Sequence, residues 1–227
     1  MCTVSWAREP GGYELFCSRD EKRSRGIAQA PRVEQRRGVR YMAPVDSDYG
    51  GTWVAINEAG VAACLLNRPG PWRGLRSRGL IIPELIRARS TDDCAFLMSG
   101  LDLHSFAPFT LLLLEADRPA LIADWDGRLL AWEDGGEARV PLTSSSFDPE
   151  GVREARVRDF ERHGGNLLKF HSSHGAAPSA YSTCMHRDDA ETVSLTRAVV
   201  KRGGIRLAYA AGAPCLYGGE YTWANFS

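Results

Sequence analysis

The chain has 227 residues, 44% of them hydrophobic, which suits one domain over residues 1–227 and excludes a disordered or fibrous protein. Its 28 basic and 28 acidic side chains balance, so no overall charge favours nucleic acid or a membrane surface as a partner. The longest apolar run, residues 111–114, is too short to span a bilayer, and no apolar segment of signal-peptide length stands near Met1. We therefore expect a cytoplasmic protein with reduced thiols and no integral membrane segment.

Apolar and polar side chains alternate over residues 2–6, which predicts a strand with unlike faces. Turn-forming residues at 9–12 and a further strand-like stretch at 13–17 predict that this strand continues into a hairpin. Because paired strands lie side by side, the end of the second strand is expected close to Cys2.

The first 90 residues hold an excess of basic charge, with fifteen Lys and Arg against nine Asp and Glu. Most of this excess comes from Arg19, Lys22, Arg23, Arg25, Arg32, Arg36, Arg37 and Arg40. Residues 26–50 show no periodicity, and we interpret them as a long, solvated loop. The alternative is a basic rim that attracts a carboxylate or phosphate.

Later segments predict further hairpins and a few helices. Residues 50–57 and 61–66 are nearly continuous in apolar residues, so this hairpin is expected to be buried on both faces. The remaining predicted elements are helices at 80–89, 91–99 (capped by Thr91) and 149–162 (capped by Asp148), and strands at 109–115, 120–124, 128–132, 182–186, 193–200 and 205–210. This order differs from the regular strand–helix alternation of a parallel sheet, and it favours an α+β fold with antiparallel sheets.

The cysteine and histidine spacing predicts no metal site. The six cysteines lie far apart in the sequence, without a Cys-x-x-Cys pair. His171 and His174 would form half of a metal site, but no cysteine or carboxylate cluster stands at ligand spacing beside them. We interpret these two histidines as loop residues.

Cys2 is the candidate for nucleophilic chemistry. If Met1 is removed, Cys2 carries both a thiol and an α-amine whose ordinary pKa of about 7.7–8.0 lets it act as a base. Such a site also needs a carboxylate to orient the amine and a cation near the sulfur. Asp20 and Arg19, at the end of the predicted partner strand, supply these two groups. Adjacent strand residues face opposite sides, so both reach Cys2 only if the chain bends there.

Several motifs resemble the NRDE family, whose eukaryotic member is transport and Golgi organisation protein 2. They are Met1-Cys2-Thr3, Ser18-Arg19-Asp20-Glu21, Gly50-Gly51-Thr52-Trp53, Asn57-Glu58-Ala59-Gly60, Ser182-Thr183-Cys184-Met185-His186-Arg187 and Thr192-Val193-Ser194. Ser18 stands in place of the family's eponymous asparagine. The family is similar to N-terminal-nucleophile hydrolases of the choloylglycine hydrolase and penicillin acylase type, which implies a four-layer αββα sandwich of two antiparallel sheets.

The resemblance also implies a function, hydrolysis of or acyl transfer from a non-peptide amide, with no cofactor required. The catalytic residues implied are the nucleophile Cys2, Asp20 to hold its amine and Asn67 to help the oxyanion. From its place beside Cys2 in the predicted hairpin, Arg19 is expected to bind a substrate carboxylate or lower the thiol pKa. Ser18, Trp53, Ser144 and His186 are expected to contact the ligand. Ser144 lies in a serine stretch where the hydrolases have an asparagine.

A non-catalytic alternative follows from the same resemblance. The wider family is associated with haem mobilisation and with lipid or acyl-coenzyme A handling, which implies a carrier or chaperone. An apolar cleft with a basic rim would suit an amphipathic anion such as haem or an acyl chain. In that case Cys2, Met185 or His186 would ligate the haem iron.

Overall fold

The computed structural model describes residues 2–70, 74–216 and 221–226. One sheet contains, in spatial order, β10 (Leu142–Thr143), β1 (Cys2–Glu9), β2 (Gly12–Lys22), β11 (Ala190–Lys201), β12 (Gly204–Ala211) and β13 (Thr222–Asn225). The second contains β3 (Gln29–Arg36), β4 (Val39–Val45), β5 (Val54–Asn57), β6 (Ala62–Asn67), β7 (Phe109–Leu114), β8 (Leu121–Trp125) and β9 (Leu130–Asp134). The helices are α1 (Ile81–Leu85), α2 (Thr91–Ser99), α3 (Pro149–Arg162) and α4 (Leu167–His171), with 3-10 turns η1 (Arg78–Leu80), η2 (Leu103–Ser105), η3 (Gly136–Arg139) and η4 (Pro214–Leu216).

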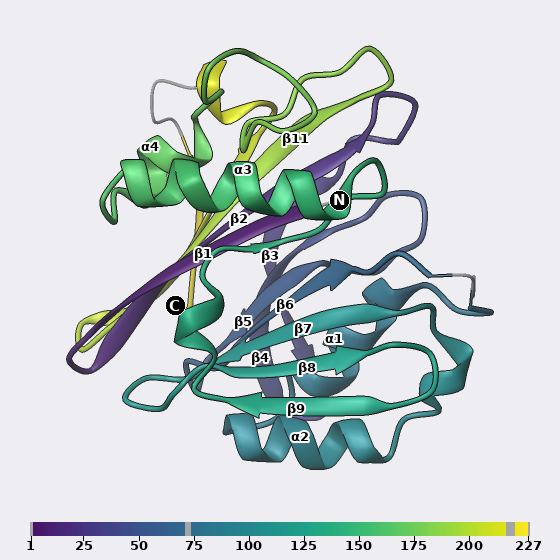
Figure 1. Cartoon of the computed structure of the whole chain (residues 1–227). Coiled ribbons are helices and arrows are strands. Elements are labelled where there is room, and N and C mark those ends of the chain that lie inside the picture. The colour runs from purple at the N-terminus through teal and green to yellow at the C-terminus, as the bar shows by residue number, and fades with distance from the viewer. Residues whose placement is uncertain (1, 71–73, 217–220, 227) are drawn as a thin grey trace.

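These elements form the predicted four-layer αββα sandwich (Figure 1). Helices α3 and α4 cover the outer face of the first sheet, and α1 and α2 cover the outer face of the second (Figure 1). All strand pairs in both sheets are antiparallel, as expected. Within the described part of the chain, no helix has the length and apolar character needed to cross a membrane.

The predicted alternation of β1 decides which side chains face which layer. Cys2 and the apolar residues that follow it at alternate positions belong to the core between the two sheets. Thr3 and Ser5 are buried on the opposite face, where they contact Arg156 of α3 and His171 of α4. The first strand therefore separates an apolar inter-sheet layer from a polar layer beneath the helices.

Residues 26–50 are not the predicted long loop, because most of them form the β3–β4 hairpin. The turn uses Arg37 and Gly38, both with positive φ (50° and 86°), as a tight hairpin connection requires. Strand β3 lies at the edge of the second sheet and carries charged side chains, such as Arg32, which pairs with Glu34 at 2.8 Å. The charges suit an exposed edge strand, and they obscured its period of two.

Other boundaries also differ from the sequence-based expectation. Residues 182–186 are not a strand but belong to the loop before β11, since the Cys184 amide donates to the carbonyl of Ser173 (2.9 Å) instead of to a neighbouring strand. The cap of α2 is Ser90 and not Thr91. Helix α3 follows its predicted cap, Asp148, and ends at the predicted residue. The short elements α4, β10 and β13 had no recognisable periodic signal.

The Asn57-Glu58-Ala59-Gly60 motif has a structural role. The side-chain amide of Asn57 donates to the carbonyls of Ile86 (2.8 Å) and Ala88 (2.6 Å). Its side-chain oxygen accepts from the amides of Ala59 and Val61, both at 3.0 Å. The buried asparagine thus closes the β5–β6 turn and ties it to the segment after α1.

Candidate active site

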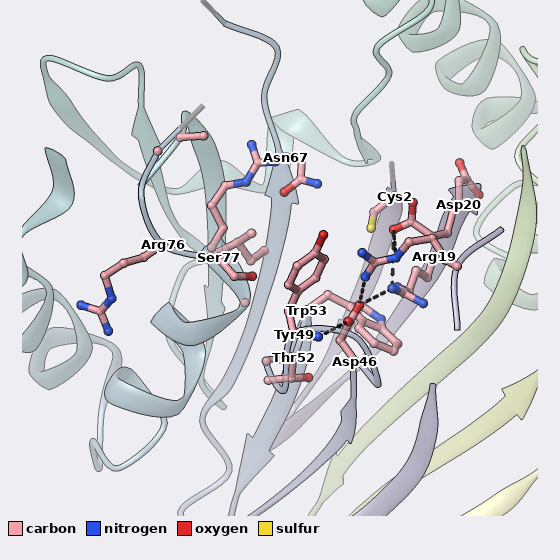
Figure 2. A pocket seen from close by; sticks show the side chains of 18 of the residues that line it. Cys2, Arg19, Asp20, Asp46, Tyr49, Thr52, Trp53, Asn67, Arg76 and Ser77 are labelled. Atoms are coloured by element: carbon pink, nitrogen blue, oxygen red, sulfur yellow. Dashed lines mark hydrogen bonds and ion pairs between the residues drawn. The ribbon is translucent and has the colours of Figure 1, made fainter. Parts of the chain in front are cut away.

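A cavity of about 630 Å³ opens where the ends of β1, β2 and β6 meet, and Cys2 forms part of its wall (Figure 2). This volume lies within the range of small-molecule sites. The cavity brings together five of the predicted residues, Cys2, Arg19, Asp20, Trp53 and Asn67. It also contains Arg25 of the basic group and residues without a sequence signal, including Asp46, Tyr49, Arg76 and Arg78.

Cys2 is the first residue of β1 and lies directly opposite Arg19 in the register of the β1–β2 hairpin. Its backbone nitrogen donates to Ser144 Oγ at 2.9 Å, which fixes the start of the strand. A hydrogen bond with the Cys17 thiol, together with burial, raises the pKa of the Cys2 thiol well above its ordinary value. The thiol is therefore protonated at neutral pH, and a base must remove its proton before it can act as a nucleophile.

Arg19 is already committed to an ion pair within the protein. Its guanidinium contacts Asp46 Oδ2 at 2.5 Å and lies over the Trp53 ring, 4.5 Å from the ring centroid. The same Asp46 oxygen accepts from Arg25, also at 2.5 Å (Figure 2). This network holds Trp53 in the cavity wall, and it neutralises much of the positive charge that Arg19 would offer to a ligand.

Other members of the basic group are also paired with acids. The pairs that lie outside the cavity are Arg23–Glu191, Arg32–Glu34, Arg36–Glu84 and Arg40–Glu58. The basic residues between Arg19 and Arg40 thus do not form one continuous positive surface. Of these residues, Arg19 and Arg25 line this cavity.

Asp20 borders the cavity, and two hydrogen bonds of its carboxylate lie on the side of β2 that faces the helices. Arg156 Nη1 of α3 donates to one carboxylate oxygen at 3.1 Å, and Thr192 Oγ1 donates to the other at 2.7 Å. Strand β11 changes register between Thr192 and Ser194, opposite Asp20 and Arg19. Arg19 and Asp20 thus make these contacts on opposite sides of β2, as adjacent strand residues do, and the irregularity lies in the neighbouring strand β11. The Asp20 carboxylate lies apart from the Asp46 network (Figure 2).

Arg78, in η1, is a cavity residue that the sequence analysis missed. Its guanidinium donates to the Pro108 carbonyl at 2.7 Å, and within the described residues it has no carboxylate partner. Burial lowers the pKa of Arg78, while the charge of a Cys2 thiolate opposes that shift. Arg78 and Cys2 thus line the same cavity.

The Gly50-Gly51-Thr52-Trp53 motif positions this arginine. A Cβ added to Gly51 would lie 2.6 Å from the carbonyl carbon of Gly79, so only glycine permits the two segments to approach so closely. The Thr52 amide donates to the Gly79 carbonyl at 3.0 Å and fixes the contact.

Asn67 ends β6 and lines the cavity, as expected for an oxyanion-binding residue. Its side chain is exposed and makes no hydrogen bond within the described ranges. The amide is therefore free to donate to a bound ligand.

Three predicted ligand-binding residues do not line the cavity. Ser18 alternates with Arg19 along β2, so it faces α4 and contacts Nδ1 of His171 at 2.6 Å. Ser144 lies behind Cys2 and accepts a hydrogen bond from its backbone nitrogen. His186 lies in the loop before β11, where its Nε2 is 3.6 Å from the Cys184 sulfur.

Several solved structures share this fold. Penicillin V acylase from Agrobacterium tumefaciens aligns with a TM-score of 0.63 and 12% identity, covering 100% of this chain and 86% of that chain. The Caenorhabditis elegans N-acylethanolamine-hydrolyzing acid amidase ortholog gives 0.60 and 12% identity, covering 87% and 92%. The mutant C2A conjugated bile acid hydrolase from Clostridium perfringens gives 0.60 and 10%, covering 100% and 92%.

Comparison with curated protein sequences returns no match. The model of the Transport and Golgi organisation 2 family matches residues 1–130, which hold Cys2, the Arg19–Asp20 pair and both glycine-containing motifs. Taken with the N-terminal-nucleophile hydrolase fold of the structural neighbours, this match shows that the chain belongs to the Transport and Golgi organisation 2 family.

Proposed function

We propose that this chain is an N-terminal cysteine hydrolase or acyltransferase that acts on a non-peptide amide bearing an acidic group. The observation that carries the proposal is the shared cavity of Cys2, Arg78 and Asn67, which combines a nucleophile, a cation without a carboxylate partner and a free amide donor. The fold supports it, since the three structural neighbours are named for amide or acyl hydrolysis.

The first step requires removal of Met1, which lies outside the described residues. The α-amine of Cys2 then takes the proton of its own thiol, because the high thiol pKa leaves the sulfur protonated until a base acts. Ser144 Oγ, which accepts a hydrogen bond from this nitrogen, holds the amine in place. The nearby negative charge of Asp20 favours the ammonium form that results.

In the second step the thiolate attacks the amide carbonyl carbon and a C–S bond forms. Asn67 donates to the oxyanion, and Arg78 stabilises the thiolate before the attack and binds the acidic group of the substrate. The C–N bond then breaks, and the leaving amine takes the proton from the Cys2 ammonium. Water or a second amine finally displaces the acyl group from sulfur, which restores the thiol.

Intact-mass measurement of the native protein and an assay with three amides test this mechanism together. The amides are penicillin V and a conjugated bile acid, which are acidic, and an N-acylethanolamine, which is neutral. We expect a mature chain beginning at Cys2, and turnover that both Cys2→Ala and Cys2→Ser abolish. Cys94→Ala, which removes a buried thiol on α2, serves as the control and should retain activity. Met1 retained on the active protein would refute the proposal.

Arg78→Gln tests the substrate preference. Loss of a charge-assisted hydrogen bond costs about 1.5–3 kcal/mol, which corresponds to a roughly 10- to 100-fold fall in kcat/KM for the acidic amides. Arg76→Gln is the matched control, because Arg76 also lines the cavity but lies over the Phe106 ring. Equal losses for acidic and neutral amides would show that Arg78 does not recognise the acid.

A carrier function is the second candidate, favoured by the protonated state of the Cys2 thiol and by a cavity wall that combines Trp53 and Leu65 with arginines. Such a wall suits an amphipathic anion, for example haem or an acyl chain. Titration with haem, repeated with Cys2→Ala, distinguishes this function from catalysis. Absence of a Soret shift at micromolar protein would eliminate haem as the ligand. His186 lies outside this cavity, so in this structure it is not placed to ligate iron there beside Cys2.

A further inference from the structure

A cluster of four metal-ligating side chains lies outside the Cys2 cavity. His174 follows α4, Cys184 and His186 lie in the loop before β11, and Cys215 lies in η4. One ligand atom of each residue lies within 4.8 Å of those of the other three. The histidine pair considered in the sequence is separated, because His171 faces Ser18 while His174 joins these more distant residues.

Two of the distances in this cluster have the values expected between ligands of one metal ion. His186 Nε2 lies 3.6 Å from the Cys184 sulfur and 3.4 Å from the Cys215 sulfur. With Zn–S of about 2.3 Å and Zn–N of about 2.0–2.1 Å, a sulfur and a nitrogen bound to one tetrahedral zinc ion are about 3.6 Å apart. Both distances agree with this value to within about 0.2 Å, the tolerance expected of a metal site.

Hydrogen bonds leave part of this cluster unsatisfied. One imidazole nitrogen carries either one proton or one lone pair, so Nε2 of His186 cannot form a well-directed hydrogen bond with both thiols. In addition, His174 Nε2 is buried and has no hydrogen-bond partner among the described residues. A cation bound by all four side chains would satisfy these groups together.

The surrounding loop is held mainly by hydrogen bonds and has little apolar core of its own. Residues 172–189 contain no helix or regular strand, and Met185 is the one large apolar side chain buried in the segment. Loops of this length inside a domain are uncommon and are usually functional. A metal ion that joins this loop to η4 would offset the conformational entropy lost on ordering it.

We infer that His174, Cys184, His186 and Cys215 form a structural zinc site. Two thiolates with two imidazoles in tetrahedral geometry are a donor set typical of zinc. Binding releases the two thiol protons, so the site with Zn²⁺ carries no net charge, which suits its partly buried position. With four protein ligands the coordination is complete, which makes the ion structural and not catalytic. The inference does not depend on the proposed amide chemistry.

The site would also support the cavity indirectly. The amide of Met185 donates to Thr192 Oγ1 (2.8 Å), which in turn donates to Asp20 (2.7 Å). Metal binding by Cys184 and His186 would therefore hold Met185 in place. Through Thr192, Met185 is linked by hydrogen bonds to the Asp20 carboxylate at the border of the Cys2 cavity.

Metal analysis of the full chain, purified under reducing conditions without chelators, tests the inference. We expect about one zinc per chain, released when a chelator is added to the unfolded protein. Cys215→Ser and His174→Gln should each lower the zinc content several-fold, whereas Cys94→Ala should leave it unchanged. Zinc retained in full by both ligand variants would overturn the assignment.

Cobalt binding by the metal-free wild-type chain provides a readout that does not depend on folding of the variants. Co²⁺ bound by two thiolates and two imidazoles should produce the visible bands of tetrahedral cobalt and a thiolate charge-transfer band, and Zn²⁺ should displace it. A reduced chain that binds neither ion at stoichiometric concentration would refute the site. A Cys184–Cys215 disulfide in the native protein, detected by peptide mapping, would also refute it, because that bond consumes both sulfur ligands.

Discussion

Acidification from pH 7.5 to 5 should destabilise the protein through His171, which is buried between β1, β2 and α4. Its ring nitrogens contact the hydroxyls of Ser18 (2.6 Å) and Ser5 (2.9 Å), so one nitrogen donates and the other accepts. Burial, and secondarily the charge of Arg156, lowers the pKa of His171 to about 3. The folded protein therefore holds this imidazole neutral at any pH above that value.

The magnitude follows from the difference between the folded and unfolded states. An unfolded histidine titrates near pH 6.5, so below that pH the unfolded chain binds one proton more than the folded chain at this position. The free energy of unfolding should then fall by about 1.4 kcal/mol per pH unit between about 6.5 and 3. At pH 5 the loss from His171 alone should reach about 2 kcal/mol.

Urea denaturation of wild type and His171→Gln at pH 7.5 and 5 measures this contribution. Glutamine can donate to one serine and accept from the other, but it does not titrate, so its stability should depend less on pH by about 2 kcal/mol over this interval. Contributions from other groups cancel in the comparison. If both proteins lost the same stability between the two pH values, His171 would not be a buried neutral histidine and the reasoning would fail.

Three further substitutions test the structure by urea denaturation. Asn57→Ala should cost about 2–4 kcal/mol, since two buried carbonyls lose their donors, and a loss below 1 kcal/mol would contradict the described hydrogen bonds. Gly51→Ala should cost about 1–3 kcal/mol, because its methyl group would meet the Gly79 backbone, and it should weaken ligand binding in the cavity as well. Arg156→Met should cost about 3–5 kcal/mol by removing the buried guanidinium that pairs with Asp20, and adding Asp20→Asn should recover part of that loss; a purely additive double variant would argue against the ion pair.

Local patterns in the sequence were sufficient to predict the hairpin that begins at Cys2. The alternation after Cys2 and the turn at residues 9–12 predicted the β1–β2 hairpin, and with it that the end of the second strand lies near Cys2. Both depend on residues near in sequence, whose side chains follow the period of a strand. The charged edge strand β3 escaped prediction, because the same period is hidden when neither face of a strand is consistently apolar.

The sequence by itself determined the α+β class, the antiparallel hairpins and the place of Cys2 at the start of a strand. Only the tertiary structure decided that Arg19 pairs with Asp46, that Arg78 lines the same cavity as Cys2, and that His174 meets Cys215. These contacts join segments that are far apart along the chain. They depend on how the two sheets and their loops pack, and no periodicity within a single segment encodes that packing.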